Sequence, residues 1–447
     1  MRRAVLVLAF VVAGCEQGAG SLVSHATPTS SSVAVAKSPS STPSWSLSQS
    51  PSVVQSPSSP SSPSSTASAS RICPPTSIAW TASLRAGSGL PQVLSGSPLF
   101  AVLEAKGTTS CAPNTVVISG LDGRARASAD FEPLPLPWTG CVGAGPWLPP
   151  SAHVAAGKVY FADGTGTIRS LDSGGKVAVV AAIPFSGLQQ MLSFAISPDG
   201  GSLMAAVFTL PPKPISGDPC SSGTWFYGPG SFTLDVYAGP SVGPVHLLYH
   251  QVLSTGSAQP IFDVMAFVGW DAVGPLVMDP TNWQGVADGD SIPIFGTFAR
   301  ADPQSGQMTQ PLDSSPQKCL VTFVGTPGDY VCTTGGIPAY TLSIRRPDHS
   351  VLWAYTHLPA YTGYAYLSPS ESSAAFTVPA GRPSGLVVTS AGSTVSVSTG
   401  PLGWLGDQVV IGSNGTDLVY VTLADPSTAV DLGFTGVFVG TISAQGV

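Results

Sequence analysis

The sequence has 447 residues, with 50 Gly and 43 Pro, and only 9% of its residues are charged. Gly and Pro weaken or break helices, so this content excludes a helical bundle, and their irregular spacing excludes collagen. A hydrophobic content of 43% excludes disorder over most of the length. Lys and Arg number 17 against 24 Asp and Glu, a balance that excludes nucleic acid as a partner on bulk charge.

Residues 1–14 have the pattern of an export signal. Arg2 and Arg3 precede the apolar run Ala4–Val12, which is too short to span a bilayer. The next residues, Val12-Ala13-Gly14-Cys15, resemble the lipobox of bacterial lipoproteins. The resemblance implies that Cys15 is acylated, becomes the mature N-terminus and anchors the chain in the lipid bilayer. The alternatives are an ordinary signal peptide with an incidental cysteine, or a buried apolar strand.

Residues 15–71 are predicted to form a disordered tether. Between Ser24 and Ser70 there are 21 Ser, 4 Thr and 7 Pro, and Lys37 is the only charged residue. Such a segment buries too little apolar surface to offset its conformational entropy. We therefore expect a spacer between the membrane and a folded domain, or a neutral filler of similar length.

Residues 72–447 are predicted to form one all-β domain. Short runs rich in β-branched and aromatic residues recur to the end of the chain, bounded by Gly, Pro, Asp or Ser. Amphipathic helical periodicity over ten or more residues does not occur. Examples of the strand-like runs are Leu99–Leu103, Thr115–Ile118, Lys158–Phe161, Phe232–Tyr237, Gly385–Thr389 and Asp417–Leu423.

One hairpin carries a family resemblance. Phe194–Val207 places Ser197-Pro198-Asp199-Gly200 between two apolar strands, and this resembles the inner hairpin of WD-repeat-like bacterial β-propellers. Weaker copies occur at Tyr366–Val378, Leu402–Ile411 and Val264–Val273. The resemblance implies a single propeller of four-stranded blades after the tether.

Seven blades are predicted, with six or eight as alternatives and a tandem of β-sandwiches as the structural rival. Units of four strands begin near residues 92, 142, 190, 260, 318, 362 and 401. The final run, Thr435–Ile442, follows a complete unit. It should therefore return to blade 1 as its inner strand and close the ring.

Seven cysteines are present, and the odd number requires one special residue, which Cys15 supplies. The other six can form three disulfides in an oxidising compartment. Cys319 and Cys332 flank a predicted hairpin turn at Gly325–Asp329, which should bring them opposite one another. Cys111 with Cys141 is a second predicted pair, and Cys73 with Cys220 follows by elimination.

No constellation of residues indicates catalysis, a metal or a cofactor. His246 and His250 are four apart, and on a strand they would lie about 13 Å apart on one face, too far for one metal ion. Asp288, Asp290 and Asp302 are interpreted as solvated turn acids rather than calcium ligands. Nucleotide-binding, zinc-protease and hydrolase motifs do not occur.

Aromatic residues give the best candidate for a binding surface. Trp138, Trp147, Trp225, Tyr227 and Trp283 fall in predicted connections that open on one end of a propeller. Flat aromatic side chains there would bind sugar rings or peptides, or would pack as small cores against the ring. We therefore expect a lipid-anchored, extracytoplasmic binding or scaffold protein of the bacterial cell envelope, with a wall polymer, peptide or protein as ligand. The alternative is an extracytoplasmic enzyme or accessory subunit with a site in the central channel.

Overall fold

The computed structural model describes residues 99–106, 113–134, 152–187, 190–209, 226–227, 230–255, 259–260, 266–284, 295–309, 311–312, 319–336, 339–358, 362–378, 384–415 and 417–442. The chain divides into two compact units, Met1–Ala67 and Ser68–Val447, and every described residue belongs to the second. The predicted boundaries after residues 14 and 71, the acylated Cys15 and the tether lie outside the described residues. Within the described ranges, no helix is long and apolar enough to cross a membrane.

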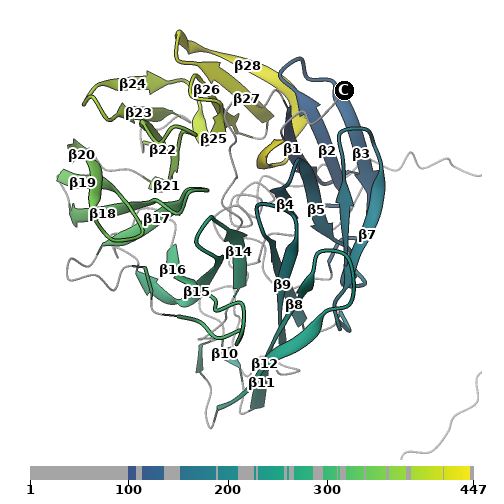
Figure 1. The fold of residues 1–447 in the computed structure, drawn as a ribbon. Coiled ribbons are helices and arrows are strands. Elements are labelled where there is room, and N and C mark those ends of the chain that lie inside the picture. The colour runs from purple at the N-terminus through teal and green to yellow at the C-terminus, as the bar shows by residue number, and fades with distance from the viewer. Residues whose placement is uncertain are drawn as a thin grey trace, which may run out of the picture. The chain divides into compact units, whose positions relative to one another are not determined.

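The second unit is an all-β propeller of seven antiparallel blades, as predicted (Figure 1). Listed from the inner to the outer strand, blade 1 has β29 (Val437–Ile442), β1 (Leu99–Glu104), β2 (Thr115–Gly120) and β3 (Ala125–Asp130). Blade 2 has β4 (Ala152–Ala155), β5 (Lys158–Ala162), β6 (Thr167–Leu171) and β7 (Val177–Ala182). Blade 3 has β8 (Gln190–Ile196), β9 (Ser202–Thr209), β11 (Gly230–Pro240) and β12 (His246–Thr255).

The remaining blades follow in chain order. Blade 4 has β14 (Ala266–Trp270), β15 (Pro275–Gln284) and β16 (Phe295–Arg300). Blade 5 has β17 (Leu320–Val324), β18 (Tyr330–Gly336), β19 (Ala339–Arg345) and β20 (Val351–Leu358). Blade 6 has β21 (Thr362–Leu367), β22 (Ser373–Thr377), β23 (Gly385–Thr389) and β24 (Thr394–Val397). Blade 7 has β25 (Gly400–Leu405), β26 (Val409–Asn414), β27 (Asp417–Thr422) and β28 (Asp425–Thr435).

Blade 4 departs from the predicted four strands, because its described part has only three. After β16 the chain turns back along it, and two hydrogen bonds hold this return in place. The Thr309 N–H donates to the Arg300 carbonyl at 2.7 Å, and the Leu312 N–H donates to the Phe298 carbonyl at 2.8 Å. Pro311 has no N–H to contribute between them. Among the described residues, this hydrogen-bonded return stands in the place of a fourth strand.

The ring closes as predicted. The C-terminal strand β29 pairs antiparallel with β1 and becomes the inner strand of blade 1. In Figure 1 the yellow C-terminal strands accordingly lie beside the blue strands of blade 1. The unit predicted to start near residue 92 therefore begins with its second strand. Closure satisfies the backbone groups of β1 that would otherwise form an open sheet edge.

The hydrophobic core lies between neighbouring blades. Side chains alternate across a strand, so each blade has one apolar face for each of its two neighbours. Strand β9 shows this plainly: Leu203, Ala205 and Val207 pack toward blade 2, whereas Met204, Ala206 and Phe208 pack toward blade 4. Five such clusters of buried residues connect all seven blades around the ring. This double burial explains why the strands have continuous apolar runs instead of alternating with polar residues.

The turn that carried the family resemblance has the expected conformation. The Gly200 N–H donates to the Ser197 carbonyl at 2.7 Å, and the Gly201 N–H donates to Asp199 Oδ1 at 2.9 Å. Gly200 has a φ of +72°, and a Cβ there would lie 2.7 Å from the Cβ of Ala156 in blade 2. Glycine is therefore required by both the turn and the neighbouring blade.

Candidate functional site

The two ends of the propeller are built differently. We call one end the turn end, because it holds the turns between the first and second strands of blades 2 to 7, all of five residues or fewer. Several of these turns contact the next blade directly. The Ala156 N–H donates to the Pro198 carbonyl at 3.2 Å, and the Ala272 N–H donates to the Thr326 carbonyl at 2.9 Å. At the turn end, short turns of neighbouring blades are thus bonded to each other directly.

We call the opposite end the connection end. Antiparallel topology places there the links from the second to the third strand of a blade and the points where the chain enters the next blade. Five long connections leave and re-enter the sheets at this end: 105–114, 131–151, 210–229, 256–265 and 285–294. The link 301–319 differs, because it leaves β16 at the turn end and runs back along that strand before it reaches β17.

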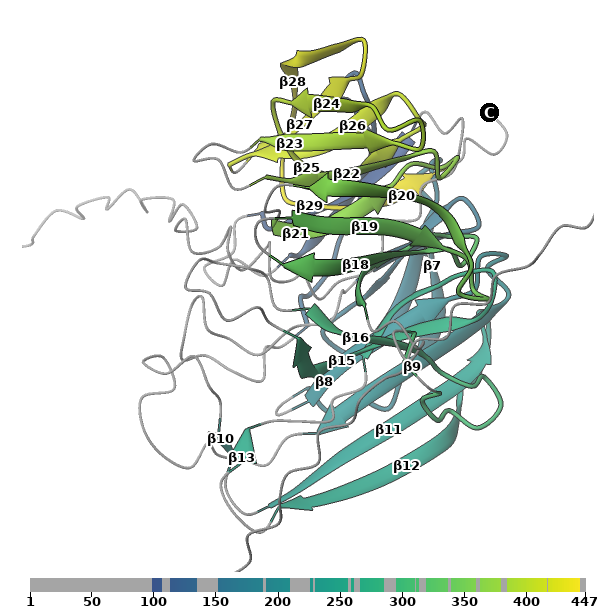
Figure 2. The ribbon, with the colours of Figure 1, turned by 90° about the vertical axis from the view of Figure 1, so that its left-hand side faces the viewer.

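A small ribbon joins two of these connections. Strand β10 (Phe226–Tyr227) lies in the connection within blade 3, and β13 (Gln259–Pro260) lies in the link from blade 3 to blade 4. The two pair antiparallel, with Phe226 opposite Pro260 and Tyr227 opposite Gln259. Figure 2 shows the ring from its side, with this ribbon beyond the strand ends of the blades. The ribbon confirms that a connection inside a blade and a link between blades meet at the same end.

The predicted aromatic residues belong to these connections, but their side chains lie outside the described part of the chain. Trp138 and Trp147 fall in 131–151, and Trp225 falls in 210–229. Tyr227 lies on the backbone of β10, and Trp283 lies near the end of β15. The structure therefore shows that these connections lie at one end of the ring. That the aromatic residues form a binding surface there stays a prediction.

The inner strands of the ring carry few reactive side chains. None of the seven contains Asp, Glu, Lys or Arg. The side chains described on β4, β25 and β29 are all buried. Several inner strands are instead connected to each other: the Trp404 indole N–H donates to the Tyr366 carbonyl at 2.8 Å, and the Phe267 N–H donates to Ser193 Oγ at 3.0 Å. Polar groups here hold neighbouring blades together.

His153 is the one histidine on the inner strands. It lies on β4, is buried, and packs against the edge of the Phe194 ring of blade 3 at a centroid distance of 4.9 Å. Burial lowers the pKa of His153 to about 4, and a backbone hydrogen bond with Phe194 opposes this shift only in part. His153 is therefore a neutral packing residue at physiological pH.

The other histidine and acid candidates have structural partners. His250 on β12 lies opposite Asp235 on β11, and its Nδ1 is 2.5 Å from Asp235 Oδ1. A bulge between β11 and β12 lies between His246 and His250, so the simple alternation expected for this strand is wrong. Asp302 accepts hydrogen bonds from the Gln304 N–H and Ser305 Oγ, at 2.9 and 2.8 Å.

The turn-acid interpretation is therefore confirmed for Asp302, whereas Asp288 and Asp290 lie outside the described residues. In the part of the chain that the structure describes, no three His, Cys, Asp or Glu side chains group as metal ligands.

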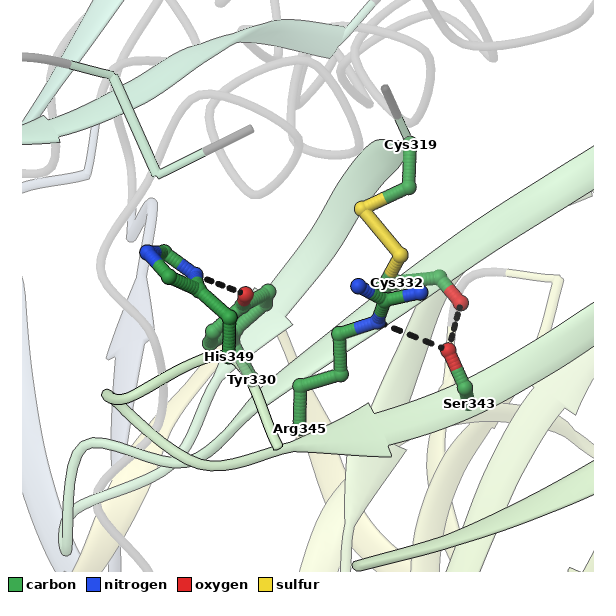
Figure 3. The surroundings of a disulfide bond; sticks show 6 residues. All are labelled: Cys319, Tyr330, Cys332, Ser343, Arg345 and His349. Atoms are coloured by element: carbon green, nitrogen blue, oxygen red, sulfur yellow. Dashed lines mark hydrogen bonds between the residues drawn. A yellow bond between two sulfur atoms is a disulfide. The ribbon is translucent and has the colours of Figure 1, made fainter. Parts of the chain in front are cut away.

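The predicted disulfide between Cys319 and Cys332 is present in blade 5, with a Cα–Cα distance of 5.4 Å. The predicted register was wrong by two residues: the pairing begins with Val324 opposite Tyr330 at the turn, so Val321, rather than Cys319, lies opposite Cys332. The surroundings are buried and polar (Figure 3). Ser343 Oγ donates to the Cys332 carbonyl at 3.2 Å and accepts from Arg345 Nε at 3.3 Å. The predicted pairs Cys111–Cys141 and Cys73–Cys220 lie outside the described residues.

Two acidic positions at the turn end were missed by the sequence analysis. Asp271 Oδ1 accepts from the N–H groups of Val273 and Gly274 and from Arg300 Nη1, so it closes the first turn of blade 4. Glu371 occupies a turn of blade 6 and faces Asp329 of blade 5. The available signal was Ser368-Pro369-Ser370-Glu371, which puts Glu where the better copy of the motif has Gly.

No family model matches the chain, and no curated protein matches it. Among solved structures, TolB from Acinetobacter baumannii is similar at 13% identity, over 68% of this chain and 64% of that chain, with a TM-score of 0.37. An oligogalacturonate lyase from Vibrio parahaemolyticus is similar at 9% identity, over 77% of this chain and 89% of that chain, with a TM-score of 0.42. The Dos1 propeller is similar at 10% identity, over 79% and 90%, with a TM-score of 0.36. The propeller assignment rests on the strand pairing of this chain itself.

Proposed function

We propose that this protein is an extracytoplasmic binding or scaffold lipoprotein, anchored to the bacterial cell membrane through acylated Cys15. The lipobox-like Val12–Cys15 supports the anchor. The Cys319–Cys332 disulfide supports an oxidising compartment, because disulfides persist outside the cytosol. The ligand is a cell-wall polymer, a peptide or a partner protein, and it binds at the connection end.

The difference between the two ends of the ring carries this proposal. Binding residues are concentrated on loops that a rigid scaffold holds in place. The turns between the first and second strands are short, and several bond to the next blade, whereas five long connections leave and re-enter the sheets at the connection end. The β10–β13 ribbon joins two of those connections at one point, through the pairs Phe226–Pro260 and Tyr227–Gln259.

The chemistry of the two regions favours binding over catalysis. The connections contain Trp138, Trp147 and Trp225, and aromatic side chains supply large contact areas for sugar rings and peptides at little entropic cost. The inner strands contain no carboxylate, lysine or arginine. General acid–base catalysis needs such groups at the reacting centre, so the channel wall itself offers little for it.

The binding test shortens one connection. Replacing residues 210–225 with Gly-Gly should leave the blades intact and lower the retention of the protein on purified cell-wall sacculi, or on a peptide array, at least tenfold. The control inserts Gly-Ser into the Ser390–Ser393 turn at the opposite end, and this variant should bind like the wild type. Equal binding by both folded variants would place the ligand elsewhere. No retention of the wild type on either probe would exclude both ligand classes.

The anchor is tested separately. Cys15→Ser should abolish labelling of the protein by radioactive palmitate and should release it from the membrane fraction. Cys73→Ser is the matched control, because it removes a cysteine that the lipobox does not contain. A wild-type protein that takes up no label would contradict the lipoprotein assignment.

A further inference from the structure

The junction between blades 5 and 6 contains a strained acidic residue. Glu371 ends the turn Ser368–Glu371, and its N–H donates to the Ser368 carbonyl at 2.8 Å. Its φ is +57°, in the left-handed region where the equivalent Gly200 of blade 3 has +72°. A non-glycine residue is strained in this region, and such strain is concentrated at positions where a side chain has a task.

Glu371 contacts blade 5 through both its backbone and its side chain. Its carbonyl accepts from the indole N–H of Trp353 on β20, at 2.7 Å. Its carboxyl reaches the first turn of blade 5, where a Cβ on Gly325 would lie only 3.0 Å from Oε1. The Asp329 carbonyl lies 3.4 Å from the same Cβ position, so Glu371 and Asp329 meet around Gly325, and the Asp329 carboxyl raises the pKa of Glu371. Glycine at 325 thus leaves room for the two acids to meet.

Two carboxylates cannot hydrogen-bond each other, because an ionised carboxyl group only accepts. Asp329 is 9% exposed, and Oε1 of Glu371 is buried with no donor among the described residues. One shared proton resolves both points. A neutral Glu371 donates to the Asp329 carboxylate, so the two groups can bond and the buried carboxyl of Glu371 needs no separate donor. Burial, the hydrogen bond to Asp329 and the charge of Asp329 raise the pKa of Glu371 to about 8.

The other charged groups near this junction are engaged elsewhere. Arg300 pairs with Asp271, whose Oδ2 would lie 3.5 Å from a Cβ on Gly328 of the same blade 5 turn. His349 is hydrogen-bonded to the hydroxyl of Tyr330 at 2.8 Å.

The neighbouring turns complete this set. Arg346 and Asp348 belong to the β19–β20 turn, which packs on Gly328 through Pro347. On the blade 7 side, Asp407 accepts from the Ser370 N–H at 2.9 Å. Among the described ion pairs, none neutralises Glu371 or Asp329.

We propose that Glu371 and Asp329 share one proton and form an alkali-sensitive latch between blades 5 and 6. The proton passes to water when the latch opens, and it returns when the two turns close. The latch makes this seam of the ring tighter in acidic than in alkaline surroundings. Its function depends on no ligand at the connection end.

Hydrogen exchange on the wild type tests the latch directly. The folded pKa of Glu371 is about 8 and its ordinary value is 4.5, so opening releases a proton between these limits. As the pH rises through this range, the fraction of molecules in which the contact between Glu371 and Asp329 is open should therefore increase by up to about tenfold per pH unit, and it should level off above pH 8. After correction for intrinsic rates, the amides of Gly325 and Glu371 should lose protection accordingly. The Gly200 amide in the equivalent turn of blade 3 is the internal control and should not.

Substitution of Glu371 gives a second, independent test of the latch. Glu371→Gln keeps a donor toward Asp329 at every pH, so its thermal midpoint should exceed that of the wild type by an amount that grows from pH 5 to pH 8. Asp407→Asn changes the neighbouring turn contact without touching the carboxyl pair, and it should keep the wild-type pH dependence. The proposal is overturned if Glu371→Gln and the wild type show the same pH dependence, or if Glu371 and Gly200 amides respond alike.

Discussion

Buried polar side chains determine how single residues of this propeller respond to pH. His153 is enclosed between blades 2 and 3, and its pKa of about 4 reflects the cost of placing an imidazolium among apolar neighbours. Its Nε2 has no hydrogen-bond partner among the described residues. Asp163 shows the opposite effect: hydrogen bonds from Thr165 and Arg169 outweigh its burial and lower its pKa. The propeller therefore disfavours the protonated form of His153, which is buried among apolar neighbours, and stabilises the ionised form of Asp163, which is hydrogen-bonded.

His153→Phe should make the protein less sensitive to acid. The folded pKa lies below the ordinary value of 6.5, so the unfolded chain takes up a proton first as the pH falls from 6.5 to 4. At about 1.4 kcal/mol per pH unit, the wild type loses up to roughly 3 kcal/mol of unfolding free energy over this range. Denaturant unfolding at several pH values should show that this loss is absent in the variant.

Phe194→Leu is the control for the histidine. It weakens the same contact without removing the imidazole, so it should lower the unfolding free energy at every pH and keep the wild-type pH dependence. Parallel pH profiles of His153→Phe and the wild type would show that His153 does not carry this proton linkage.

Hairpins are the units of this fold, and turn residues alone do not set their register. In blade 5 the predicted hairpin forms and its cysteines join, yet Val324 pairs with Tyr330 at the turn and a bulge between Val321 and Phe323 changes the register by one residue, so the cysteines are not directly opposite. In blade 3 a bulge between β11 and β12 also changes the register. Bulges increase the local twist of a strand, and twist depends on how the sheet packs on its neighbours. A pattern of local residues therefore predicts the hairpin and misses its exact pairing.

Removing the disulfide should weaken blade 5 measurably. The bond closes a loop with a sequence separation of 13, which corresponds to about 2–3 kcal/mol on the chain-entropy model. Cys319→Ala together with Cys332→Ala should lower the unfolding free energy by at least that amount, since both side chains are buried. Dithiothreitol should destabilise the wild type and leave the double variant unchanged. An equal response of the two proteins would assign the effect of the reductant to another disulfide.

The molecule as a whole is held together by its closure. Strand β29 brings the end of the chain to blade 1, and buried clusters lie on both sides of that blade. Phe438 on β29 packs with Phe100 in the cluster between blades 7 and 1. Gly403 on β25 lies directly against the Phe438 ring, where a Cβ would be 2.4 Å from Cε1. The close approach of these inner strands therefore depends on a missing side chain.

Gly403→Ala should destabilise the whole ring by about 1–3 kcal/mol, because the ring of Phe438 or one of the strands has to move. Gly269→Ala is the matched control: it also lies on an inner strand, but a Cβ there meets nothing within 4 Å. We expect the control to change the unfolding free energy by less than about 1 kcal/mol. Urea denaturation of the two variants measures this difference. An equal loss of unfolding free energy in both would contradict the conclusion that the close packing of Gly403 on Phe438 is needed to close the ring.

The sequence by itself determined the all-β class, the seven blades, the closing strand and the Cys319–Cys332 pair. These features depend on strand patterns, turn residues and chain order, which are local and therefore visible in neighbouring residues. Only the tertiary structure decided that Glu371 meets Asp329, that His153 is enclosed beside Phe194, and that β10 pairs with β13. The partners in each pair are more than thirty residues apart, and their contact depends on how two blades or two connections pack, which no local pattern encodes.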